Sequence, residues 1–304
     1  MSRRIAASVI AAVALASGCG RAGLERTADA AYSGGRFAEA YAAYAPLAKD
    51  EGGDLWLKAA AAARGAGRRD LAAAALESFG NTSPAHRAEA ADGLEQVMAG
   101  ADQARDPDGL RIALAAYQRL APDRPVGRWV LALLRLAPIA PGEAIDWLPA
   151  ALAAAPGRTE FDTLLLRYGA ALEEAGNCGE ALAAYESVIR RRADSARRWA
   201  ATRGVARCGL ALGATALRSD DAIAADRWFT RVAAVDPASG AGRRALVGLG
   251  DARLVQGDTI AAVIAWQRAA DAGRRGDSIG VMAARRIRAA AGTNRAGDTT
   301  RVRE

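Results

Sequence analysis

The apolar positions between Asp162 and Ala193 form two helical periods separated by a turn. Leu165 and Leu172 are seven residues apart, which places them on one face of an α-helix. Gly176 can adopt the left-handed conformation that ends a helix, and Asn177 can cap the helix that follows. The segment therefore predicts two helices that meet at a tight turn.

The second of these helices carries Ala181 and Tyr185 on one face, and Glu180 can complete a capping box with Asn177. A small residue lets two helices approach closely, and the aromatic ring four positions later fills the space beside it. A pair this short cannot bury its apolar face alone, so the pattern predicts neighbours of the same kind. The small residues that align with Ala181, spaced 31 to 44 residues apart, are Ala40, Ala72, Ala113, Ala144, Ala225 and Ala262.

The repeated unit resembles the tetratricopeptide repeat (TPR), which has about 34 residues and a W-x2-L-G-x2-Y…A-x3-F…P pattern. The residues that carry the resemblance are Leu165, Tyr168, Gly169, Leu172, Ala181 and Tyr185. The resemblance implies an all-α solenoid, a right-handed superhelix of about seven helical hairpins over residues 24–291. A C-terminal helix, Ser278 to Ala291, is expected to cap the stack, and residues 292–304 are expected to form a disordered polar tail.

Composition supports the all-α prediction. Apolar residues make up 51% of the 304 residues but aromatic residues only 5%, so alanine supplies much of the apolar fraction and favours closely packed helices. The length exceeds that of one average domain, yet a stacked array needs no division into domains because each repeat touches only its neighbours.

The amino terminus has the features of an export signal. Arg3 and Arg4 precede an apolar run, Ile5 to Ala16, that is too short to span a bilayer. Residues 15–19 resemble a bacterial lipobox, which implies a signal peptide at 1–18, acylation of Cys19 and a lipid-anchored tether at 19–23; an ordinary cleaved signal is the alternative. Gly20 then favours the outer membrane, facing the periplasm, in a host that has one.

The net charge is +7, and arginine supplies most of it. A basic surface can attract an acidic partner, although the arginine content can also reflect genome base composition. The densest cluster can form one anion-binding partner patch or a spread of solvated side chains, and export disfavours nucleic acid. Its members are Arg190, Arg191, Arg192, Arg197, Arg198, Arg203 and Arg207.

Cys178 and Cys208 are predicted to lie at the same end of two antiparallel helices that turn near residues 193–195. Export to an oxidising compartment makes a disulfide between them possible in chemical terms. Two buried free thiols, which behave as small apolar residues, are the alternative.

Catalytic patterns in the sequence lack their required context, so we expect no enzyme activity, no cofactor and no small-molecule substrate. Residues 276–280 match G-x-S-x-G, but a helix precedes them and the only histidine, His86, lies far upstream. Residues 18–23 match G-x-G-x-x-G without a preceding strand. The adjacent acids Glu173-Glu174 and Asp220-Asp221 point in different directions on a helix, and one histidine makes a zinc site improbable.

The resemblance implies a non-catalytic scaffold of an envelope complex, anchored to the membrane by lipid, that binds peptides or helices of partner proteins in its concave groove. The alternative is a cell-wall-binding accessory protein that regulates a peptidoglycan synthase or hydrolase. TPR domains that hold chaperone tails use lysines and asparagines on their first helices. The comparable face here has Leu166, Ala170 and Glu173, which does not support such a clamp.

Overall fold

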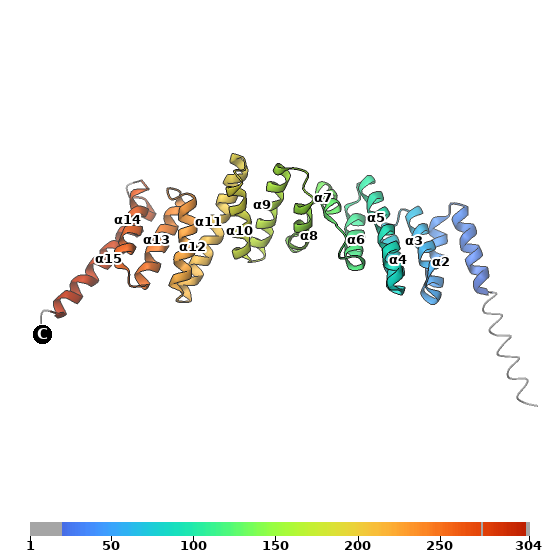
Figure 1. Ribbon diagram of the computed structural model, residues 1–304, viewed down its shortest axis with the longest axis horizontal. Coiled ribbons are helices and arrows are strands. Elements are labelled where there is room, and N and C mark those ends of the chain that lie inside the picture. Colours follow the sequence, from blue (N-terminus) through green and yellow to red (C-terminus); the bar gives the residue numbers. More distant parts are fainter. Residues whose placement is uncertain (1–19, 275, 302–304) are drawn as a thin grey trace, which may run out of the picture. The chain divides into compact units, whose positions relative to one another are not determined.

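The computed structural model describes residues 20–274 and 276–301, and every regular element within these ranges is a helix (Figure 1). The all-α prediction is therefore confirmed. The expected signal peptide, residues 1–18, and the expected lipidation site, Cys19, lie outside the described residues. No helix among the described residues is long and apolar enough to cross a membrane.

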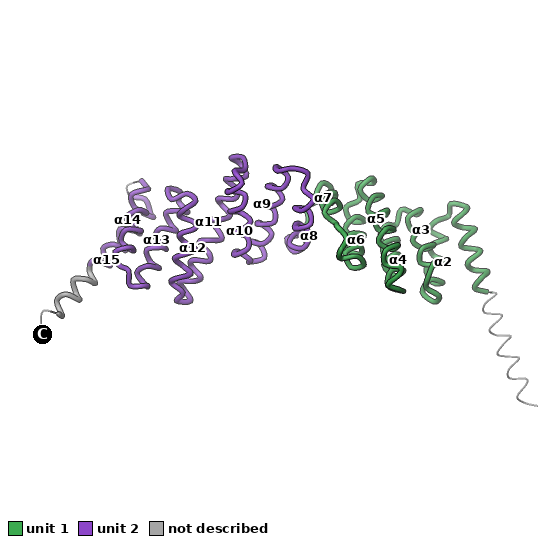
Figure 2. The backbone as a smooth tube through the Cα atoms, viewed as in Figure 1, with its two compact units in different colours: residues 1–139 green, residues 140–304 purple. Residues whose placement is uncertain are grey.

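The chain divides into two compact units, residues 1–139 and 140–304 (Figure 2). That the two units together form the single array expected over residues 24–291 stays a prediction. The boundary falls in the proline-rich turn of the fourth expected hairpin, where Ala140 is extended, with φ −66° and ψ 152°. Extension is favoured there because Pro141 follows, and proline disfavours the helical conformation of the residue before it. The two helices of that hairpin consequently belong to different units.

The described part of unit 1 begins with a helix over residues 20–33, which includes residues 20–23 of the expected tether. From α2 to α7, each helix packs against the next along the chain. These elements are α2 (Phe37–Glu51), α3 (Asp54–Gly65), α4 (Arg69–Thr82), a 3-10 turn (Pro84–His86), α5 (Arg87–Gln103), α6 (Pro107–Leu120) and α7 (Gly127–Leu136).

Unit 2 continues the same plan, again with each helix packed against the next. Its odd-numbered helices α9, α11, α13 and α15 also pack on one another in order, so they line one side of the hairpins. The elements are α8 (Pro141–Ala153), α9 (Arg158–Glu174), α10 (Cys178–Arg190), α11 (Ser195–Arg218), α12 (Ala222–Val235), α13 (Gly240–Val255), α14 (Thr259–Asp271) and α15 (Ser278–Arg301).

The aligned alanines occupy equivalent places in the even-numbered helices α2 to α14, and each is at most 5% exposed. The residue four positions later is also buried in every case, because i and i+4 share a helix face. Those larger residues are Tyr44, Leu76, Tyr117, Leu148, Tyr185, Phe229 and Trp266. The alignment of small residues thus identified the second helices correctly, including the divergent ones around Ala113 and Ala144.

Several turns and helix ends differ from what the local sequence predicts. Gly176 is left-handed as predicted, with φ +81°, but Arg105 and Asp220 hold the same position in other turns without being glycine. Asn177 is the residue before α10, yet its side chain accepts no capping hydrogen bond, so the predicted capping box does not form. Helix α2 continues through Pro46 to Glu51, although a proline inside a helix removes one backbone hydrogen bond.

Helix α15 packs on α14 and α13 as the predicted cap, but it runs to Arg301 and so includes most of the expected tail. No proline interrupts residues 292–301, so the helical hydrogen bonding can continue there. Ala283 and Ala290 are buried, whereas Val281 is 40% exposed. The N-terminal cap of α15 is Asp277, whose carboxylate accepts a hydrogen bond from Gly280 N.

Candidate functional site

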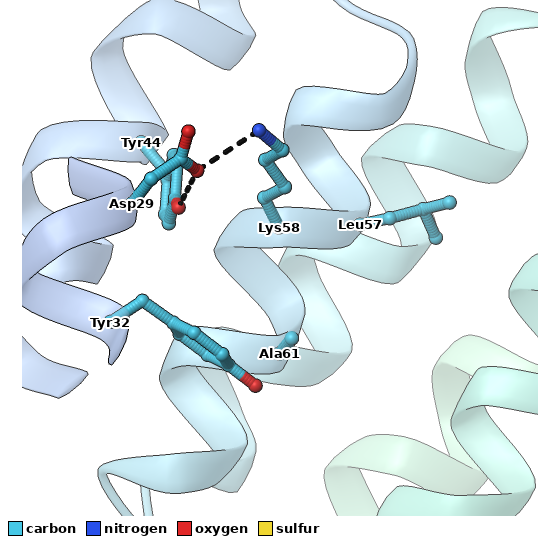
Figure 3. A pocket seen from close by; sticks show the side chains of 6 residues that line it. All are labelled: Asp29, Tyr32, Tyr44, Leu57, Lys58 and Ala61. Carbon is cyan, nitrogen blue, oxygen red and sulfur yellow. Dashed lines mark hydrogen bonds and ion pairs between the residues drawn. The ribbon is translucent and has the colours of Figure 1, made fainter. Parts of the chain in front are cut away.

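A hollow of about 330 Å³ opens in unit 1 between the helix of residues 20–33 and α3 (Figure 3). We call it groove 1. Tyr44 of α2 closes its floor, and the ring of Tyr32 stands at its edge. Its lining residues are Asp29, Tyr32, Tyr44, Leu57, Lys58 and Ala61.

A hydrogen-bonded hub centred on Asp29 holds groove 1 together. Tyr44 Oη donates to the Asp29 carboxylate, and Lys58 Nζ of α3 lies 3.0 Å from the same oxygen and 2.7 Å from Glu25 Oε1. The bond from Tyr44, followed by that from Lys58, lowers the pKa of Asp29, while burial raises the pKa of Tyr44 to about 12. One lysine therefore faces two carboxylates, which leaves the hub with one excess negative charge.

Unit 2 contains a hollow of about 250 Å³ built in the same way, which we call groove 2. It lies between α9 and α11, with Tyr185 of α10 at its base. The two first helices contribute both apolar and charged side chains. They are Leu166 and Ala170 from α9, and Trp199, Ala200, Arg203 and Arg207 from α11.

The hub of groove 2 is Glu173. Its carboxylate accepts hydrogen bonds from Tyr185 Oη and from Arg207 Nη2, both at 2.8 Å. Arg207, together with the tyrosine, lowers the pKa of Glu173, and burial raises the pKa of Tyr185. The tyrosine ring fits between α9 and α11 because both helices present glycine to it, at Gly169 and Gly204.

The same arrangement, in which an aromatic residue and a cation both contact one carboxylate, occurs twice more and is therefore a repeated feature of the hairpins. Tyr117 and Arg128 both contact Glu95, and Trp266 and Arg286 both contact Asp251. In each case an aromatic residue of a second helix and a cation of the next first helix meet one carboxylate. The sequence carried a signal for this arrangement, because the cation follows the carboxylate by 29 to 35 residues. We did not predict it.

The seven arginines of the candidate patch have different partners in the structure, and whether any of them bind a partner protein stays a prediction. Two of them pair with carboxylates of α9: Arg191 with Asp162, near the start of the helix, and Arg207 with Glu173, near its end. Arg190 lies 3.5 Å from a Glu186 oxygen, Arg197 pairs with Asp194 and also donates to Thr163, and Arg192 and Arg198 are exposed. Of the seven, Arg203 and Arg207 line groove 2.

Cys178 and Cys208 are joined by a disulfide in the structure, with their Cα atoms 5.0 Å apart. Cys178 is the first residue of α10, as expected, but Cys208 lies within α11 and not at its end. The bond therefore links two consecutive hairpins beside Arg207, and Cys208 is fully buried. Whether the bond forms in the exported protein stays a prediction.

The other residues considered for chemistry have structural partners. His86 stacks on Phe79, with ring centroids 4.4 Å apart, and its Nδ1 lies 2.8 Å from Thr82 Oγ1. Glu173 belongs to the hub of groove 2, whereas the adjacent Glu174 is exposed. Asp221 caps α12 by accepting from Ala224 N. No group of three or more His, Cys, Asp or Glu residues within the described part of the chain could hold a metal ion.

No family model and no curated protein matches the chain. Among solved structures it is similar to PilW, a widely conserved type IV pilus biogenesis factor, at 14% identity and TM-score 0.30, over 75% of this chain and 96% of that one. It is also similar to the TPR2AB-domain:pHSP90 complex of yeast Sti1, at 14% identity and TM-score 0.32, over 90% and 99% of the two chains. A TPR repeat-containing protein from Cytophaga hutchinsonii gives 14% identity and TM-score 0.30, over 85% and 98%.

These scores carry no argument about function. The fold assignment rests on the helices themselves, which pack in sequence within each unit and bury an alanine and a larger residue at equivalent positions of each second helix. The described chain is an all-α array of TPR-like helices.

Proposed function

We propose that this protein is a non-catalytic scaffold that binds segments of partner proteins. The observation that carries the proposal is a pair of open hollows, each lined mainly by the first helices of neighbouring hairpins. First helices of stacked hairpins offer a continuous surface on which an extended segment or a helix can lie. The hubs under both hollows fix the spacing of those helices before any partner arrives.

We also propose that the scaffold works in the bacterial envelope, held at the outer membrane and facing the periplasm by lipid on Cys19. The support is the sequence of residues 1–19, with its basic start, short apolar run and lipobox-like end. Two or more acyl chains anchor a protein stably where one does not. Metabolic labelling with a radioactive fatty acid should mark the wild-type chain and not Cys19→Ala.

The scaffold proposal is tested by site-specific photocrosslinking in cells. A photoreactive amino acid at Trp199, which is 61% exposed and lines groove 2, should yield adducts with a defined envelope protein. The matched control is the same amino acid at Gln267, which is exposed on the second helix α14. Equal adducts from both positions, or none from either, would contradict partner binding in the groove.

The same experiment separates the alternative role. A cell-wall-binding accessory should sediment with purified peptidoglycan in the absence of other proteins, and the scaffold should not. Sedimentation with peptidoglycan combined with no protein adduct at Trp199 would replace the scaffold proposal with the accessory one.

A further inference from the structure

Groove 2 contains one arginine that no carboxylate neutralises. Arg203 makes no ion pair among the described residues, and its guanidinium carbon lies 4.6 Å from the centre of the Trp199 ring. Both side chains are exposed, and Trp199 is 61% exposed. Tryptophan and arginine are the residue types most enriched where a partner binds, and here both lie exposed side by side in one groove.

The other charges at groove 2 are already paired. Arg207 is bound to Glu173 through two of its nitrogens, and Arg197 is paired with Asp194. Arg203 therefore gives the groove one uncompensated positive charge. The remaining walls are apolar, with Leu166 and Ala170 on α9 opposite Ala200 on α11.

This combination defines the chemistry of an occupant. A guanidinium binds a carboxylate through two parallel hydrogen bonds, and stacking on an indole holds its plane ready to do so. Leucine and tryptophan surfaces a few ångströms away favour an aliphatic or aromatic side chain. An occupant that carries only one of these groups would leave the other half of the groove unsatisfied.

We propose that groove 2 is a docking site for a protein segment in which an aspartate or glutamate lies next to a large apolar residue. The carboxylate binds Arg203, and the apolar side chain lies against Trp199 and Leu166. The inference rests on the proposed scaffold function and adds the chemistry of the partner. An anionic lipid surface is a poorer fit, since such surfaces are recognised by clusters of several cations and the groove offers one free arginine.

Groove 1 supplies an internal contrast. Lys58 there is shared by Glu25 and Asp29, so the hub has one excess negative charge and no free cation that could bind a carboxylate. Acidic segments are consequently expected to bind groove 2 and not groove 1.

The test is selection of phage-displayed random 12-residue peptides on the immobilised full-length chain. We expect the selected peptides to be enriched in Asp or Glu beside Leu, Phe or Trp. Arg203→Ala and Trp199→Ala should each weaken binding of a selected peptide about tenfold, the loss of one charge-assisted contact or one aromatic anchor. Arg203→Glu should shift a repeated selection toward lysine and arginine.

The matched control is Arg198→Ala, which removes an exposed arginine from the same helix without touching the groove and should change affinity less than twofold. Peptides without acidic residues, or peptides equally sensitive to Arg198→Ala, would overturn the proposed chemistry and leave the scaffold function standing. Binding to phosphatidylglycerol vesicles in preference to every peptide would also overturn it. Failure to select any peptide, together with no crosslink at Trp199, would end both proposals.

Discussion

Grooves 1 and 2 are two versions of one construction. In each, a buried tyrosine of a second helix donates to a carboxylate of its own first helix, and a cation of the next first helix completes the hub. Tyr44 and Tyr185 are both 2% exposed. The hub is therefore a common feature of the repeated hairpins, and it does not by itself indicate what either groove binds.

The two grooves differ in how firmly they are held and in what surrounds the hub. The carboxylate of groove 1, Asp29, has a side chain 46% exposed, whereas that of Glu173 in groove 2 is 20% exposed. Groove 2 also has glycine contacts on both sides of its tyrosine and a disulfide beside its arginine. Repeats with a common frame can thus differ in rigidity and specificity through a few added side chains.

The largest expected difference in stability between the two grooves comes from the disulfide, which unit 1 lacks among its described residues. Its cysteines are 30 residues apart, and closing a loop of this size stabilises by roughly 3 to 4 kcal/mol in the chain-entropy model. Reduction should speed amide hydrogen exchange in α10 and α11 and leave α2 and α3 unchanged. Titration of two free thiols in the exported protein before reduction would show that the bond does not form.

The next difference concerns the glycines that face aromatic rings. A Cβ added at Gly204 would overlap the buried ring of Tyr185, so Gly204→Ala should cost about 1 to 3 kcal/mol of unfolding free energy. Gly65→Ala in unit 1 meets Phe37, which is half-buried and can turn away, and should cost less than about 1 kcal/mol. Denaturant unfolding measures both, and equal costs would contradict the difference in rigidity.

Removing the tyrosine hydroxyls should also destabilise the two hubs unequally, but the difference in unfolding free energy should be smaller than for the glycine variants. Tyr185→Phe deletes one hydrogen bond to a mostly buried carboxylate and should cost about 1 kcal/mol. Tyr44→Phe should cost about half as much, because water can replace the hydroxyl at the more exposed Asp29. Local hydrogen exchange in α9 and in the helix of residues 20–33 reports each loss, and a larger effect for Tyr44→Phe would reverse our ranking.

The smallest expected effect is a difference in how much each hub carboxylate contributes to the loss of stability at low pH. The pKa of Glu173 in the folded protein is below its usual value, so the ionised carboxylate stabilises the fold. This contribution to the unfolding free energy is complete above the unfolded pKa of about 4.3 and is lost as the pH falls through the lower folded pKa. Glu173→Gln should therefore flatten the decline of the unfolding midpoint below about pH 5. Asp29→Asn should flatten it less, since Asp29 is more exposed. Identical pH profiles for the two variants would show that exposure does not distinguish the hubs.

Sequence periodicity determined the helical class and the second helices of this protein. Burying an alanine and a larger residue four positions later is a local requirement of close helix packing, so it recurs visibly along the chain, from Ala40 and Tyr44 to Ala262 and Trp266. The division near Ala140 was not predicted, although Pro138 and Pro141 lie beside it in the sequence.

Only the tertiary structure decided the chemistry of the grooves. The arginine cluster looked continuous in sequence, but carboxylates from other helices neutralise Arg191 and Arg207 and leave Arg203 free beside Trp199. Such pairings join residues about 30 positions apart, across helices whose rotation the sequence does not specify. Helical periodicity is a short-range property of the chain, whereas charge compensation in a groove depends on which side chains the packed helices bring together.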